Sequence, residues 1–129
     1  MKKTTAVSAL FVVAGAYDGL LGLAFLFGAN AIFRWSQVTP PNHFAYVQFP
    51  GALLVIFGLM FLAIAGKPRE NRSLIPYGIL LKLSYCGIVF YYWFTAGIPA
   101  LWKPFAVFDL AFVALFVWAY RRLRNVGST

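Results

Sequence analysis

The sequence predicts an all-α protein, an integral membrane four-helix bundle that forms a single domain over residues 1–129. Its residues are 62% hydrophobic and 11% charged, whereas about a quarter of the residues in a soluble domain are charged. Fourteen Phe and four Trp are too many for one small core, so part of this apolar surface needs lipid as its solvent. The apolar residues are also gathered into four long runs.

These runs predict membrane-spanning helices at about 5–29, 44–65, 74–96 and 104–120. Each run is long enough to cross a hydrocarbon core about 30 Å thick at about 1.5 Å per residue. Helices satisfy their own backbone hydrogen bonds in lipid, and the alternating polarity of membrane β-strands is absent from the runs. We therefore expect four transmembrane helices.

The first run begins like a secretory signal, with Lys2 and Lys3 ahead of apolar residues. It continues to Phe27, which is too long for the apolar part of a signal, so we expect a retained helix. The later connections are short and contain turn residues: TPPN (39–42), GKPRENRS (66–73) and GIPALWK (97–103). Short connections favour antiparallel neighbours in a bundle.

The basic residues predict the orientation of the helices. If the N-terminus is inside, the outer side holds Arg34 and Lys103, and the inner side holds Lys2, Lys3, Lys67, Arg69, Arg72, Arg121, Arg122 and Arg124. This positive-inside bias predicts a multi-pass protein of the inner (plasma) membrane with both termini in the cytoplasm. It also accounts for the net charge of +8 without a nucleic-acid partner.

Aromatic residues agree with the same spans. The outer interface is predicted at Trp35, Tyr46, Trp93 and Trp102, and the inner interface at Tyr77, Trp118 and Tyr120.

Three ionisable side chains remain within the predicted spans: Asp18, Lys82 and Asp109. Each costs about 2.5–3.5 kcal/mol at a helix centre on the insertion scale, so each needs a partner or a hydrated cavity. From the helical rise, Lys82 lies about 12 Å from the inner boundary, close in depth to Asp18, and Asp109 lies about 8 Å from the outer boundary. We predict a Lys82–Asp18 pair with Asp109 as its third member.

Other polar residues are candidates for the same network or for a ligand site. Tyr85 and Tyr92 follow Lys82 on one stripe of the third helix, and Gln48 lies near the expected level of Asp109. On the first helix, Gly15, Gly19 and Gly22 have the small-residue spacing that lets helices approach closely. The purpose of the network is open between a structural role, a ligand pocket, and proton or ion movement.

No catalytic or metal-binding residues are predicted. His43 is the single histidine and Cys86 the single cysteine, whereas a zinc site needs several ligands and a catalytic cysteine needs an adjacent base. No nucleotide motif occurs and no cofactor is indicated, which disfavours an enzyme.

The stretch FPGALLVIFGLMFLAIAGKPRENRSLIPYGILLKL (49–83) resembles the central hairpin of DoxX-like small four-helix bacterial membrane proteins. The shared features are a Gly-rich second helix, a short basic loop and an apolar third helix. The resemblance implies a compact four-helix bundle in the bacterial inner membrane and a role sometimes associated with quinone-linked redox complexes.

We expect first a non-catalytic accessory or assembly subunit of a larger membrane complex, because the chain is small and lacks catalytic motifs. Its partners would be the lipid bilayer and other membrane subunits, or further copies of itself. One alternative is a protein that binds a lipid, quinone or other hydrophobic small molecule around Lys82 and Asp18. A second alternative is a proton-coupled transporter that works as a homo-oligomer.

Overall fold

The computed structural model describes the backbone of residues 2–127 and the side chains of residues 4–124. Its helices are α1 (Lys2–Ser36), α2 (Ala45–Gly66), α3 (Ile75–Phe94) and α4 (Lys103–Gly127), and short 3-10 turns, η1 (Arg72–Leu74) and η2 (Ala100–Trp102), precede the last two. The described residues contain no strand. Four of their helices are long and apolar enough to cross a membrane. The all-α membrane bundle predicted from the sequence is confirmed.

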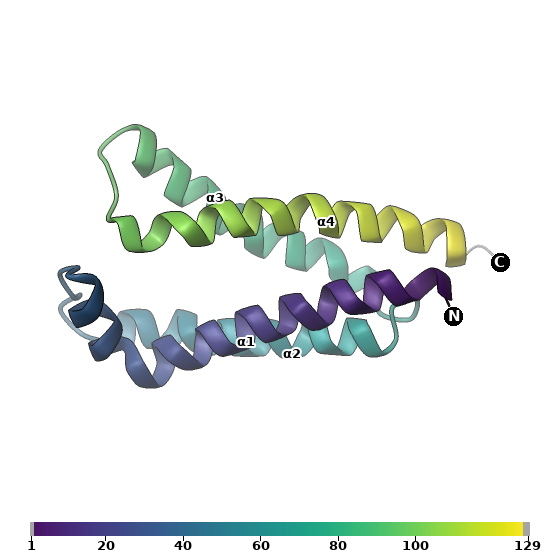
Figure 1. Ribbon diagram of the computed structural model, residues 1–129, viewed down its shortest axis with the longest axis horizontal. Coiled ribbons are helices and arrows are strands. Elements are labelled where there is room, and N and C mark those ends of the chain that lie inside the picture. The colour runs from purple at the N-terminus through teal and green to yellow at the C-terminus, as the bar shows by residue number, and fades with distance from the viewer. Residues whose placement is uncertain (1, 128–129) are drawn as a thin grey trace.

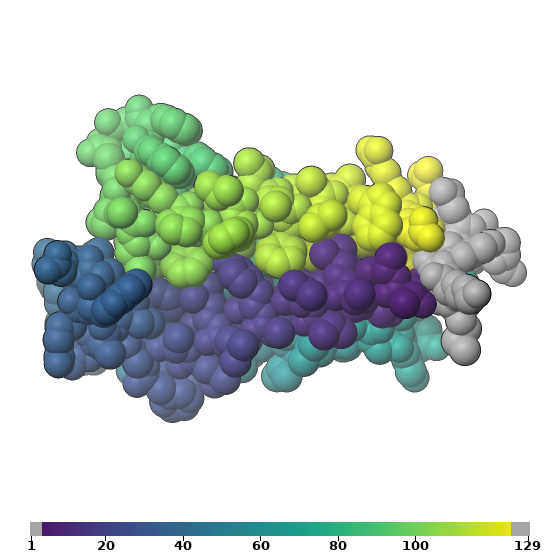
Figure 2. Space-filling model, in the orientation of Figure 1, coloured from purple at the N-terminus to yellow at the C-terminus, as the bar shows by residue number. Residues whose placement is uncertain are grey.

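The helices form two antiparallel hairpins, α1 with α2 and α3 with α4 (Figure 1). The α2–α3 connection, the beginning of α1 and the end of α4 lie together, and we call this the terminal end of the bundle. The opposite end, with the α1–α2 and α3–α4 connections, is the loop end. Contacts within each hairpin are extensive, whereas α2 touches α3 at few positions. Figure 2 shows α4 lying along α1 on the visible face.

Helix α1 is longer than the predicted run. It continues past residue 29 to Ser36, with a break in helical geometry at Gly28 (φ −122°, ψ 20°), and the chain leaves it through Gln37 in the left-handed region (φ 58°). Its 35 residues correspond to about 52 Å, more than the hydrocarbon core. Its ends therefore extend beyond the apolar layer.

The other boundaries follow local chemistry. Helix α2 begins where the Ala45 N–H donates to His43 Nδ1 at 3.1 Å, which gives the single histidine a capping role. Helix α3 ends at Phe94, two residues before the predicted limit, and Gly97 (φ 88°) turns the chain. Helix α4 runs on from the predicted end at Tyr120 to Gly127.

The first hairpin is held together by close backbone approach. Gly15 and Gly22 of α1 face Gly58 and Gly51 of α2, so that a Cβ at Gly58 would stand 2.9 Å from the Gly15 carbonyl oxygen. A Cβ at Gly22 would overlap the Gly51 carbonyl oxygen. Lipid is as apolar as the helix surfaces, so the hydrophobic effect does not bring membrane helices together. Dispersion forces between closely packed backbones drive their association instead.

The terminal half of the bundle is a closed apolar core to which all four helices contribute. Phe11 and Phe116 stack with ring centroids 4.7 Å apart, and Phe61 lies against both rings. The core consists of Val7, Phe11, Ala14, Phe61, Ile64, Ile75, Phe116, Ala119 and Leu123. Because these side chains fill the terminal half, any internal space must lie nearer the loop end.

A basic clamp closes the terminal end. The Arg72 guanidinium lies 3.6 Å above the Tyr120 ring, and its Nε–H donates to the Tyr120 carbonyl oxygen at 2.9 Å. The α2–α3 connection is thereby tied to α4.

The glycine contacts give a stability test with an internal control. We expect Gly22→Ala to destabilise the protein by about 1–3 kcal/mol, because the new methyl group forces the α1 and α2 backbones apart. Gly19→Ala is the matched control, since a Cβ there meets no atom within 4 Å. Thermal unfolding in detergent measures both variants, and equal losses of stability would contradict the close-packing account.

Candidate functional site: a buried ion triad beneath an apolar cavity

Lys82 lies between two carboxylates at the centre of the bundle. Its Nζ donates to Asp18 Oδ1 at 2.7 Å and to Asp109 Oδ1 at 3.0 Å. Lys82 and Asp18 are each 1% exposed and Asp109 is 7% exposed. We call these three residues the ion triad. The pairing that helix depth indicated is present in the structure.

The helical stripes explain how the triad is assembled. Along α1, buried residues recur every three or four positions, and Asp18 occupies one of these positions between Ala14 and Gly22. Along α3, Lys82 follows Gly78 and precedes Cys86 on the buried face. Side chains at such spacings share one face of a helix, so both charges point into the bundle. The Cys86 thiol also lies in this interior and donates to the Ala106 carbonyl oxygen at 3.4 Å.

Aromatic rings surround the ammonium group. Lys82 Nζ lies 5.0 Å from the Phe112 ring centroid, 5.2 Å from that of Tyr17 and 5.9 Å from that of Phe61. The faces of aromatic rings attract cations within about 6 Å. The rings and the two carboxylates therefore stabilise the charged lysine where water is excluded.

The triad also joins the two hairpins. Asp18 belongs to α1, whereas Lys82 and Asp109 belong to α3 and α4. Because contact between α2 and α3 is slight, the Lys82–Asp18 pair is an important polar link between the halves of the bundle. An ion pair in low dielectric holds such a link at a specific register.

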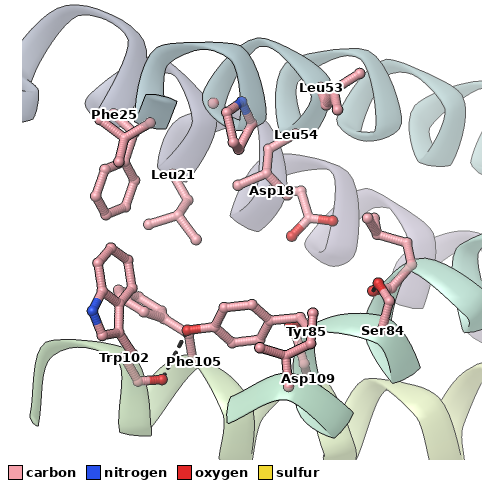
Figure 3. A pocket seen from close by; sticks show the side chains of 15 residues that line it. Asp18, Leu21, Phe25, Leu53, Leu54, Ser84, Tyr85, Trp102, Phe105 and Asp109 are labelled. Carbon is pink, nitrogen blue, oxygen red and sulfur yellow. Dashed lines mark hydrogen bonds between the residues drawn. The ribbon is translucent and has the colours of Figure 1, made fainter. Parts of the chain in front are cut away.

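A cavity of about 370 Å³ lies on the loop-end side of the triad. Figure 3 shows the Asp18 carboxylate directed into it, with Phe25, Trp102 and Phe105 around its far end. Its lining is almost wholly apolar and comes from all four helices: Asp18, Leu21, Phe25, Val47, Pro50, Gly51, Leu53, Leu54, Leu81, Ser84, Tyr85, Ile88, Trp102, Phe105 and Asp109. This size and character are those of small-molecule sites.

The cavity opens sideways between α2 and α3. Leu53 of α2 and Ile88 of α3 both line it and are 36% and 61% exposed. Pro50 and Ser84 are likewise exposed lining residues on the same two helices. Since these helices span the apolar layer, the opening faces lipid.

The two carboxylates, but not Lys82, are among the described residues that line this cavity. Lys82 lies behind them, toward the closed core. One carboxylate oxygen, Asp18 Oδ2, is buried and has no hydrogen-bond partner among the described atoms. Buried polar atoms are usually paired, because leaving one unpaired costs about 1–3 kcal/mol. Asp18, a residue at the floor of the cavity, therefore carries an unused acceptor.

Not all of the residues proposed from the sequence join the triad. Tyr85 lines the cavity, but its hydroxyl donates to the Trp102 carbonyl oxygen at 2.8 Å (Figure 3) and not to a carboxylate. Gln48 instead donates to the Leu26 carbonyl oxygen at 3.3 Å, close to the break at Gly28. Tyr92 is 46% exposed and packs edge-on against Tyr91. Depth suggests Gln48 and the helical stripe suggests Tyr92 as members of the network, but tertiary packing places both side chains elsewhere.

Sequence reasoning missed the part that the loop end contributes to the site. Trp102, expected at the outer membrane interface, is partly buried and stacks on Phe25 with centroids 5.7 Å apart, where it forms the far wall of the cavity. The proline-rich start of the fourth helix gave no signal for this inward packing. The described residues bring no three His, Cys, Asp or Glu side chains together.

Comparison with protein-family models, curated proteins and solved structures finds no match to this chain. The DoxX-like resemblance of the central hairpin stays a prediction, and function must be argued from the site itself.

The triad makes a prediction about non-additivity. We expect Lys82→Met to destabilise the protein by about 3–5 kcal/mol, because it leaves two buried carboxyl groups without their cation. The triple variant Lys82→Met/Asp18→Leu/Asp109→Leu removes all three charges and should recover most of that loss. Unfolding of both variants in detergent measures the difference. A triple variant less stable than the single one would show that the charges are not mutually compensating.

Proposed function

We propose that this protein binds an amphiphilic small molecule in the cavity above the ion triad, with the polar end of the ligand at the carboxylates and its apolar part toward the lipid. The observation that carries this proposal is the buried, unpartnered Asp18 Oδ2 at the floor of an otherwise apolar cavity. A ligand that supplies a hydrogen bond there would satisfy this oxygen, and a lateral opening gives it a route from the bilayer.

A purely structural role for the triad explains fewer features of the site than ligand binding does. Holding α1, α3 and α4 in register requires the Lys82 contacts, but it requires neither an empty volume above them nor a second Asp18 oxygen without a donor. Well-packed apolar side chains would fill such a volume in a bundle whose only task is to be stable. The cavity therefore favours binding over scaffolding alone.

That the protein is an accessory subunit of a larger complex remains a prediction from its size and composition. The exposed aromatic side chains, such as Trp35, Phe49 and Phe94, would suit a protein partner, but lipid solvates the same surfaces. Proton-coupled transport by a homo-oligomer likewise rests on the ionisable residues alone. No feature of the described residues favours either hypothesis over ligand binding.

The proposed orientation places the terminal end in the cytoplasm of a bacterial cell and the cavity in the outer leaflet of its inner membrane. Arg69, Arg72 and Arg121 support this arrangement, since they gather near the terminal end, whereas Arg34 and Lys103 lie at the loop end. The side chains of Lys2 and Lys3, which contribute to the same bias, lie outside the described residues.

A plug variant tests the cavity directly. Ser84 lines it and is exposed on α3, so Ser84→Trp should fill the opening without touching the triad. We expect native mass spectrometry after mild extraction to find a small molecule on the wild-type protein and at least tenfold less of it on Ser84→Trp. Ala111→Trp is the control, because Ala111 is exposed on α4 and is not a lining residue. Equal occupancy of the three proteins would overturn the proposal.

Cysteine labelling tests the orientation. Asn42 is exposed in the α1–α2 connection, Ser73 is exposed in the α2–α3 connection, and the native Cys86 is buried. We expect a membrane-impermeant maleimide added to intact cells to label Asn42→Cys and to label Ser73→Cys only after lysis. The reverse pattern would place the cavity in the cytoplasmic leaflet.

A further inference from the structure

We infer that the ligand of this cavity is a cationic amphiphile, with an ammonium or guanidinium head and an apolar body. This inference rests on the proposed function and names the chemical class that the site would select. The ligand class follows from the polar groups of the lining residues and from which of these groups already have hydrogen-bond partners within the protein.

Two of the three side-chain donors that line the cavity, those of Tyr85 and Ser84, are already committed to protein acceptors. Tyr85 Oη donates to the Trp102 carbonyl oxygen at 2.8 Å, and Ser84 Oγ donates to the Leu81 carbonyl oxygen at 2.7 Å. Lys82 Nζ bonds both carboxylates from behind the cavity floor. Figure 3 shows the indole nitrogen of Trp102 on the ring edge away from Asp18. Among the lining residues, the buried polar atom without a partner is an acceptor, Asp18 Oδ2; the Tyr17 hydroxyl is also buried and unpartnered, but Tyr17 is not a lining residue.

The formal charges at the floor do not balance. Two carboxylates, Asp18 and Asp109, share one ammonium, that of Lys82, so the ionised triad carries one net negative charge. No Lys or Arg is among the described residues that line the cavity. An uncompensated charge in low dielectric is costly, and a cationic head group beside Asp18 Oδ2 would neutralise it while donating the missing hydrogen bond.

The walls suit the rest of such a ligand. Tyr85, Trp102 and Phe105 bring aromatic rings to the cavity, and the faces of such rings attract cations. Beyond the floor, the lining apart from Ser84 is aliphatic or aromatic up to the opening between Leu53 and Ile88. An alkyl or aryl body would occupy this part and reach the lipid, at a gain of about 25 cal/mol for each Å² of apolar surface buried.

The same features disfavour two other classes of hydrophobic ligand. A quinone is recognised by donors to its carbonyl oxygens, and the two hydroxyl donors that line this cavity, those of Ser84 and Tyr85, are engaged elsewhere. A fatty acid would place a third carboxylate beside Asp18 and Asp109. Of the lipid and quinone ligands considered from the sequence, the geometry therefore favours those with a positively charged head.

Three probes with one chain length test the head group: dodecylamine, dodecanol and dodecanoate, titrated at neutral pH into the full-length protein in phosphatidylcholine nanodiscs. Native mass spectrometry counts bound probe, and the specific component is the part that Ser84→Trp removes and Ala111→Trp leaves. We expect specific binding of dodecylamine to be at least tenfold tighter than that of dodecanol, with no specific binding of dodecanoate.

Asp18→Asn should reduce the affinity for dodecylamine to that for dodecanol and leave dodecanol unchanged. If Asp18→Asn does not fold, Asp109→Asn serves as the second variant with the same expected result. The comparison of the three probes on the wild-type protein requires neither variant. If dodecanol or dodecanoate binds specifically and as tightly as dodecylamine, the cationic class is wrong while the binding function stands. If no probe shows a component that Ser84→Trp removes, the cationic class fails; the retained ligand detected on extraction then decides the proposed function separately.

Discussion

The structure depends on one interaction, the contact of the Lys82 ammonium with the carboxylates of Asp18 and Asp109 inside the bundle. Each of these groups alone costs about 2.5–3.5 kcal/mol at the centre of a membrane helix. Together, and surrounded by aromatic rings, they become tolerable and fix how the two hairpins meet. Close glycine packing holds α1 and α2 together without the triad. The triad is therefore needed chiefly between the two hairpins, whose helices lie farther apart.

The position of the triad divides the bundle into two unlike halves. Toward the terminal end, Phe11, Phe61 and Phe116 fill the space between all four helices. Toward the loop end, the separation of α2 from α3 leaves a cavity that those helices open to lipid. The triad that links the two hairpins therefore also lies at the floor of the cavity, which its two carboxylate residues line and Lys82 does not. Asp18 belongs to both features, because its Oδ1 accepts from Lys82 and the residue lines the cavity, while its Oδ2 is buried without a hydrogen-bond partner among the described atoms.

The sequence predicts the fold well, because apolar runs of membrane length leave few alternatives. Depth along a helix also sufficed to pair Lys82 with Asp18, since a buried charge must find its counter-ion nearby. Depth and helical spacing did not suffice for the other two candidates. Gln48 lies near the expected level but donates to a backbone carbonyl oxygen, and Tyr92 lies on the expected stripe but is turned to the exterior. A pocket near Lys82 and Asp18 was among the alternatives, but its shape was not predictable, because it arises from how far α3 diverges from α2. Trp102 closes the cavity from a connection whose prolines indicate only a turn.

The most direct test of the central claim is a structure of the protein crystallised from a lipid mesophase, at a resolution that shows bound molecules. We expect elongated density between α2 and α3, with its polar end within hydrogen-bond distance of Asp18 Oδ2. A cavity closed by movement of α3 onto α2, with Asp18 Oδ2 bonded to a protein donor, would contradict the account.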